Sequence, residues 1–248
     1  MRLVDARSSS ELPPIMCANP CPNVERTYTL EQNDDKTPAY STLYFLSDIH
    51  PILQNESYYH DDADANGANF ASITWVVMSF INGRTKYSSP QPQYHQTTPN
   101  VIPGKLAGGS VIVLNGSTPC EDKESDYHNW YNQEHGLLLA NVPGWKAGRR
   151  YRVEKVYGDI EEVCGASTLF GLNVYDEQNG LGGPVWQASV HTDWTKRIQS
   201  QRSKPNYRAG VEVVIFTIAS PNQFEQPCRS HIPLLNAEQI DHIGCHQR

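Results

Sequence analysis

The residues with the clearest capacity for chemistry lie in one short segment, from Tyr127 to Leu138. If this segment is helical, Tyr127, Tyr131, Glu134 and Leu138 form one stripe, because a helix advances about 100° per residue. His135 then lies about 40° around the helix from Tyr131. An imidazole can exchange protons near neutral pH, and a tyrosine hydroxyl can donate a hydrogen bond to a substrate oxygen. We therefore predict His135 and Tyr131 as catalytic residues.

Aromatic residues around this segment are expected to shape a pocket for a flat or polycyclic ligand. The predicted substrate-binding residues are Tyr127, Trp130, Glu134, Leu138, Trp145, Tyr151, Phe170, Tyr175, Trp186, His191 and Trp194. Each of the aromatic residues could instead be packed in a core. His135 itself could be a structural residue bonded to a backbone carbonyl.

The chain has 248 residues, with 20 Lys+Arg against 27 Asp+Glu and a net charge of -7. This acidic balance argues against binding to nucleic acid or to an anionic membrane. The longest apolar runs are shorter than the roughly 18 residues of a membrane span. No apolar stretch follows the first charges, so a signal peptide is not expected. We predict a cytoplasmic protein with a hydrophobic small-molecule substrate.

Metal and cofactor motifs are weak. In the tail, Cys228-x-x-His231 and His242-x-x-Cys245 could complete a zinc site, but the apolar segment between them favours docking on a core. The segment 62–67 imitates the start of a calcium loop whose twelfth position, Ile73, cannot bind calcium. No phosphate-binding or zinc-protease motif is present. We predict no metal and no cofactor, although one histidine would suffice to ligate haem.

An internal repeat organises the chain. The segment Glu25–Glu31 parallels Gly148–Glu154, and Ser41–Leu46 parallels Ser167–Leu172. Matches in the same order and at similar spacing indicate two copies of one unit. The predicted divisions are 1–105 for a degenerate first repeat, 106–220 for a complete second repeat, and 221–248 for a tail that packs on the barrel.

The second copy predicts a ferredoxin-like βαββαβ unit, an antiparallel sheet with two helices on one face. Its strands are expected near 111–114, 149–156, 168–175 and 210–218, with helices near 127–141 and 186–201. The first copy predicts strands near 26–30, 40–46 and 73–80, and an irregular segment at 54–69. Only 24 residues precede Glu25, so we expect this copy to lack its first strand and helix. The resulting open sheet edge would be covered by the tail or by a second chain, in a homodimer.

The helix Asp126–His135, the turn Val142–Trp145 and the strand residues Arg149–Tyr151 together resemble the EthD-like branch of the dimeric α+β barrel superfamily. The shared pattern is an aromatic-Tyr-x-x-Glu-His helix, a Pro-Gly turn, and a strand carrying Arg and Tyr. The resemblance implies an α+β fold, with two tandem ferredoxin-like units forming one intramolecular barrel. It also implies cofactor-free chemistry of the kind found in fungal secondary metabolism, with the Glu-His signature at Glu134 and His135.

The function predicted first is a cofactor-independent lyase or cyclase that tailors a polyketide- or terpenoid-like molecule, by decarboxylation or by pericyclic cyclisation. In a pericyclase, His135 would orient the substrate without transferring a proton. One alternative is a non-catalytic small-molecule-binding or structural barrel, which a side-chain-filled space beside His135 would favour. The other alternative is haem-dependent oxidation.

Overall fold

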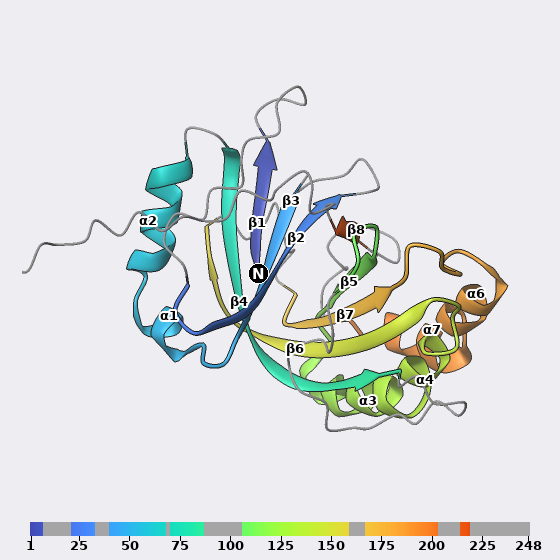
Figure 1. Cartoon of the computed structure of the whole chain (residues 1–248). Helices are drawn as coiled ribbons and strands as arrows, with labels where there is room; N and C mark the ends of the chain where they lie inside the picture. The colour runs from blue at the N-terminus through green and yellow to red at the C-terminus, as the bar shows by residue number, and fades with distance from the viewer. Residues whose placement is uncertain are drawn as a thin grey trace, which may run out of the picture.

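The computed structural model describes residues 1–6, 21–32, 40–67, 70–86, 106–158, 167–202 and 214–218. Eight strands form one closed barrel, and all their pairings are antiparallel (Figure 1). The strands are β1 (Arg2–Ala6), β2 (Val24–Gln32), β3 (Tyr40–Leu46), β4 (Phe70–Thr85), β5 (Val111–Ser117), β6 (Trp145–Tyr157), β7 (Leu169–Tyr175) and β8 (Val214–Ile218).

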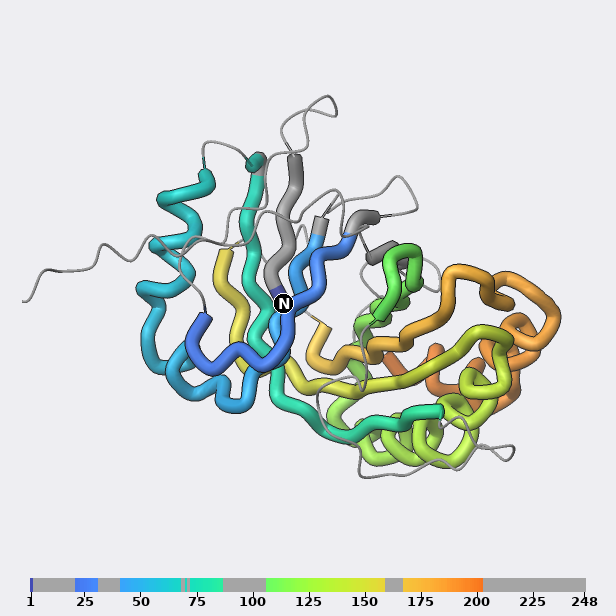
Figure 2. The backbone as a smooth tube through the Cα atoms, in the orientation of Figure 1, coloured from blue at the N-terminus to red at the C-terminus, as the bar shows by residue number. Residues whose placement is uncertain are grey.

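The two halves of the barrel have the same strand order. The first half runs β4-β1-β3-β2 and the second runs β8-β5-β7-β6, each with its first strand between its fourth and third. The pairs β2·β8 and β4·β6 then join the halves, and Figure 2 shows β4 and β6 running side by side over most of their length. The predicted α+β class with two ferredoxin-like sheets in one barrel is confirmed. An origin by tandem duplication stays a prediction.

The first strand of the first half is present, contrary to expectation. Residues Arg2–Ala6 form β1, which pairs with both β3 and β4. The prediction was wrong because it treated the strand and the following helix together and found 24 residues too few for both. The strand alone needs only five residues. The described strands leave no open sheet edge, so the reason given for a homodimer falls away. The segment 7–20 and the tail 221–248 lie outside the described residues.

Helices cover the outer face of each half (Figure 1). The first half carries α1 (His50–Gln54) and α2 (Ser57–Asn66). The second half carries a short 3-10 turn η1 (Glu121–Lys123), α3 (Glu124–Trp130), the π-helical turn η2 (Tyr131–His135), α4 (Gly136–Leu139), α6 (Pro184–Val190) and α7 (Asp193–Ser200). After α4 the chain turns at Gly144, whose φ of 79° favours glycine.

Helix α2 replaces the irregular segment expected at 54–69. Its sequence is polar, but Asp62 and Asn66 are buried against β4. The Trp75 indole donates to Asp62 Oδ2 at 2.7 Å, and Asn66 Nδ2 donates to Asp62 Oδ1 at 2.8 Å. Side-chain hydrogen bonds therefore hold this helix to the sheet, a mode of packing that an apolar-periodicity rule does not detect. Asp62 therefore has a structural role in joining α2 to β4.

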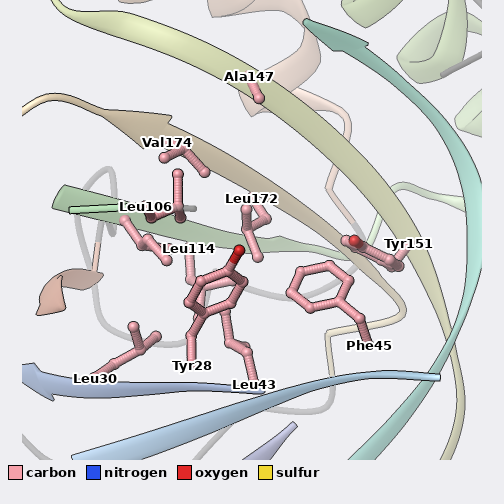
Figure 3. Packing of buried hydrophobic residues seen from close by; sticks show 11 residues of the cluster. Tyr28, Leu30, Leu43, Phe45, Leu106, Leu114, Ala147, Tyr151, Leu172 and Val174 are labelled. Atoms are coloured by element: carbon pink, nitrogen blue, oxygen red, sulfur yellow. The ribbon is translucent and has the colours of Figure 1, made fainter. Parts of the chain in front are cut away.

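One large apolar cluster occupies much of the barrel interior (Figure 3), and a smaller one around Val76 and Phe170 also lies on the inner side. The buried members of the large interior cluster are Tyr28, Leu30, Leu43, Phe45, Leu106, Ile112, Leu114, Ala147, Tyr151, Leu172 and Val174. Other clusters lie between the sheet and the helices, around Trp75 in the first half and around Trp130 and Trp145 in the second. Every residue of β7 is buried, because the interior cluster covers one of its faces and the helices cover the other.

The sequence repeat agrees with the strands at one match and not at the other. Tyr28 and Tyr151, aligned by the first match, both lie in the interior cluster. The second match aligns Leu43 with Leu169, yet Leu43 faces the interior and Leu169 packs under the helices. Successive strand residues face opposite sides of a sheet, so this second match is out of register by one residue.

Closure of the barrel at β2 can be tested with two substitutions in that strand. Leu30 is fully buried in the interior cluster, whereas Val24 is 37% exposed. We expect Leu30→Ala to lower the free energy of unfolding by about 2–5 kcal/mol, because it leaves a cavity in the core. The matched Val24→Ala should change it by no more than about 0.5 kcal/mol. Urea unfolding followed by circular dichroism measures both, and equal losses would contradict the inward direction of Leu30.

Candidate functional site

The predicted catalytic residues lie on the π-helical turn η2, which interrupts the helical segment across the second sheet. π-Helical turns of this kind occur frequently at functional sites. Tyr131 and His135 are both buried on the sheet side of the turn. The ring of Tyr131 lies over Gly171 of β7, where an added Cβ would be 3.7 Å from its Cε2 and Oη atoms. Such a distance is an ordinary van der Waals contact, so Tyr131 packs closely on this strand position.

His135 is held by stacking and by one hydrogen bond. Its ring stacks on Trp130 with 4.2 Å between centroids and meets the edge of Tyr131 at 5.6 Å. Its Nδ1 lies 3.3 Å from the Ser189 carbonyl oxygen. That oxygen can only accept, so the contact places the proton of a neutral imidazole on Nδ1. The other ring nitrogen, Nε2, then carries a lone pair, and it has no hydrogen-bond partner among the described residues.

Burial keeps this imidazole neutral. His135 is only 6% exposed, and loss of solvent lowers its pKa from 6.5 to about 4. The hydrogen bond to Ser189 opposes this shift, and the positive charge of Arg150 adds to it. At neutral pH the residue is therefore a hydrogen-bond acceptor and a weak base, and its protonated form would be a comparatively strong acid.

A cavity of about 40 Å³ lies beside His135, between the helices and the outer face of the second sheet. Its lining residues are Val113, Asn115, Tyr127, Trp130, Tyr131, His135, Leu139, Gly171, Asn173, Tyr175, Trp186, Val190, Thr195, Gln199 and Arg202. Three buried polar atoms of this lining have no hydrogen bond within the described part of the chain: Asn115 Oδ1, Tyr131 Oη and Arg202 Nε. Because an unpaired buried polar atom costs about 1–3 kcal/mol, a cluster of them marks a place for a polar ligand or water.

A buried cation lies behind the aromatic wall of this cavity. The Arg150 guanidinium is centred 4.5 Å from the Tyr131 ring and 5.4 Å from the Tyr127 ring. It donates to His128 Nδ1, and the other nitrogen of that imidazole lies 3.2 Å from Glu124 Oε1. Burial and the charge of Arg150 lower the pKa of His128. His128 thus belongs to a polar chain from Glu124 to Arg150 and is not a solvated side chain of the outer helix face.

The structure brings six of the predicted site residues together at this cavity: Tyr127, Trp130, Tyr131, His135, Tyr175 and Trp186. The predicted residues on the other helix faces have different contacts. Glu134 accepts a hydrogen bond from Thr192 Oγ1 at 2.6 Å, and the Trp194 indole donates to Asp126 Oδ1 at 3.1 Å. Leu138 is half-buried outside the cavity lining, and His191 is exposed at the end of α6.

Three predicted binding residues come from strands and also lie outside the cavity lining. Trp145 is buried in the helix–sheet layer, where its indole donates to Asn173 Oδ1 at 3.1 Å. Tyr151 and Phe170 belong to clusters on the inner side of the barrel. The strand residues that face inward could not be distinguished before the strand register was known.

Several polar lining residues were not predicted, notably Asn115, Asn173, Thr195 and Arg202. Asn115 and Asn173 lie on the helix side of two largely apolar strands, β5 and β7. Asparagine is depleted in strands, so its presence within two neighbouring buried strands was a usable signal. Thr195 and Arg202 had no such signal, because polar residues are common on amphipathic helices and at their ends.

Within the described ranges, no group of three or more His, Cys, Asp or Glu side chains is arranged to hold a metal ion. The Cys228–Cys245 segment lies outside those ranges. A membrane-spanning helix is likewise not found there, since none of the described helices is long and apolar enough.

No protein-family model matches this chain, and no curated protein matches it in sequence. Among solved structures, an anthrone oxidase-like protein is similar at 14% identity and a TM-score of 0.46, over 78% of this chain and 76% of its own. A proposed monooxygenase from Lactobacillus acidophilus is similar at 11% identity and a TM-score of 0.40, over 80% and 79% of the two chains. A major regulator of staphylococcal pathogenesis follows at 11% identity and a TM-score of 0.35, over 78% and 84%. Similarities this low carry no argument about activity.

The lowered pKa of His135 predicts a specific pH dependence of stability. As the pH falls from about 6.5 to about 4, the unfolded chain binds a proton at His135 that the folded chain does not bind. Folding should therefore lose up to about 3 kcal/mol in this window through this residue. His135→Phe should remove that share, whereas the exposed His60→Phe should retain it. Urea unfolding at a series of pH values measures the effect, and an unchanged slope in His135→Phe would contradict the neutral buried imidazole.

Proposed function

We propose that this chain is a cofactor-independent enzyme of the lyase or cyclase type, acting on a small hydrophobic molecule in the cavity beside His135. The observation that carries the proposal is the set of unpaired polar atoms at an aromatic-lined cavity: His135 Nε2, Tyr131 Oη and Asn115 Oδ1. A substrate with a carbonyl group next to an acidic C–H or O–H would pair with these atoms. Polyketide-like molecules contain such groups. The proposal includes that this chain belongs to the EthD-like branch of the dimeric α+β barrel superfamily.

The roles follow from the chemistry of each group. Tyr131 donates a hydrogen bond to the substrate carbonyl oxygen, where negative charge develops when the neighbouring carbon loses a proton or carbon dioxide. His135 Nε2 takes the proton from carbon, and the resulting imidazolium returns it to the enolate or carbanion. The low pKa of His135 makes the return step favourable and the first step demanding. The rings of Trp130, Tyr175 and Trp186 hold a flat substrate in place.

One observation favours a second candidate, a non-catalytic binding or structural barrel. The cavity of about 40 Å³ is far below the roughly 300 Å³ or more of ordinary ligand pockets. A complete polycyclic substrate would need the side chains of this cavity to move apart. Haem would need still more space, so the cavity does not fit that group.

A test of the proposal uses 2,4-pentanedione, the shortest 1,3-diketone and therefore the smallest fragment of a polyketide chain. Deuterium exchange at its central carbon, followed by NMR in D₂O, reports removal and return of a proton. We expect the protein to accelerate this exchange without an added cofactor. His135→Gln should reduce the enzymatic rate about 100-fold, and Tyr131→Phe about tenfold.

His60→Gln provides the matched control, because His60 is exposed on α2 and belongs to the first half. It should exchange the diketone at the wild-type rate. Binding of the diketone without accelerated exchange would favour the non-catalytic barrel. Absence of both binding and exchange would contradict the proposed site.

A further inference from the structure

A second cavity, of about 70 Å³, is lined mostly by residues of the first half, together with Tyr151 of β6 and Leu172 of β7. It is found where β1 begins its pairing, at Arg2 opposite Thr42 of β3 and Trp75 of β4. Interior residues such as Leu43 and Phe45 line one part of it, and Trp75 and Ile52 of the helix layer line another. This cavity therefore connects the interior cluster with the layer beneath α1.

One buried polar group of this cavity lacks a partner. Tyr151 is 6% exposed, and its hydroxyl oxygen forms no hydrogen bond within the described residues. Figure 3 shows this hydroxyl directed toward the middle of the interior cluster, on the side of Leu172 and Phe45. Burial raises the pKa of Tyr151, so the group stays a neutral donor at any physiological pH.

Two aromatic side chains in the adjoining helix layer have paired polar groups, in contrast to the Tyr151 hydroxyl. The Trp75 indole donates to Asp62 Oδ2 at 2.7 Å. The Tyr157 hydroxyl, on the same strand as Tyr151, donates to the Ile52 carbonyl oxygen at 2.7 Å. An unpaired buried hydroxyl costs about 1–3 kcal/mol of stability, and a bound acceptor would recover it.

We infer that this cavity is a second ligand site, specific for a small uncharged apolar molecule with a single hydrogen-bond acceptor, such as a ketone or an ether. The Tyr151 hydroxyl would donate to that acceptor, and the apolar part would lie among Leu43, Phe45 and Leu172. None of the described lining residues has a charged side chain, and the N-terminal ammonium of Met1 donates to the Val76 carbonyl oxygen at 2.8 Å. A cationic ligand would lose its hydration without a counter-charge, and the lining side chains would give an anion no charged partner. Met1 and Met78 at the lining can adapt to ligands of different shape.

This site is independent of the one proposed at His135. Tyr151 faces the inside of the barrel, whereas His135 and Tyr131 lie between the sheet and the helices outside it. The two cavities share no lining residue.

The test compares cyclohexanone with methylenecyclohexane, which has nearly the same shape and lacks the carbonyl oxygen. Ligand-observed NMR titrations give both dissociation constants. We expect wild-type protein to bind the ketone about fivefold more tightly, as one added neutral hydrogen bond predicts. Tyr151→Phe should bind the two ligands equally and should have a higher melting temperature without ligand, because an unpaired hydroxyl has been removed.

Tyr58→Phe is the matched control, because Tyr58 packs beside the same helix layer without lining the cavity. It should keep the fivefold preference. Val76→Ile adds a methyl group to the lining and should weaken the binding of both ligands by the same factor. This measurement tests the location of the site even if Tyr151→Phe fails to fold. Equal binding of the two ligands by wild-type protein would overturn the inference, as would a preference that survives in Tyr151→Phe.

Discussion

Closure of eight antiparallel strands into a barrel divides the side chains of every strand into an inner and an outer set. The rest of the structure depends on this division. The inner set forms apolar clusters inside the barrel, and the outer set must be covered by helices. It also separates residues that are close in sequence, because Tyr151 of β6 faces inward while Arg150 beside it contacts the rings of Tyr127 and Tyr131 outside. Because of this division, Tyr151 lines one cavity inside the barrel, and Tyr131 and His135 line another between the sheet and the helices.

The chemistry available to His135 is a consequence of the same burial. An imidazole between Trp130 and the sheet loses its hydration, and the only described group that hydrogen-bonds to it is a carbonyl oxygen. A nearby carboxylate would have raised its pKa, but Glu134 is turned toward Thr192 and Glu124 is paired with Arg152 and His128. Buried positive charge at Arg150 acts in the same direction as burial. The site is therefore poised to bind neutral polar groups, and a proton placed on His135 would be given up readily.

Much of the architecture could be predicted from the sequence, because long apolar or alternating runs specify β3, β7 and the helix containing His135. The failures have physical causes. Five residues suffice for β1, which leaves a weak pattern, and α2 is held by side-chain hydrogen bonds that periodicity does not report. For the site, a regular helical wheel brought Tyr127, Tyr131 and His135 to one side but could not anticipate the π-helical turn. The inward direction of Tyr151 depends on strand register, which a single sequence does not determine.

The two halves share a strand order but differ in how the buried polar atoms between sheet and helices are hydrogen-bonded. In the layer beneath α1 and α2, Trp75 of β4 and Tyr157 of β6 both donate hydrogen bonds to the helices, and the Tyr59 hydroxyl donates to the Ile73 carbonyl oxygen at 3.2 Å. In the second half, by contrast, Asn115 and Tyr131 leave buried polar atoms unpaired beside a cavity. A layer that serves only to cover a sheet gains stability from pairing such atoms. In the first half the buried Asn66 Oδ1 of α2 is also unpaired among the described residues, but Asn66 lines neither of the two cavities. The unpaired atoms of the second half differ in belonging to residues that line one cavity, where a bound partner could pair with them, and this is the physical reason to propose the chemistry for that half.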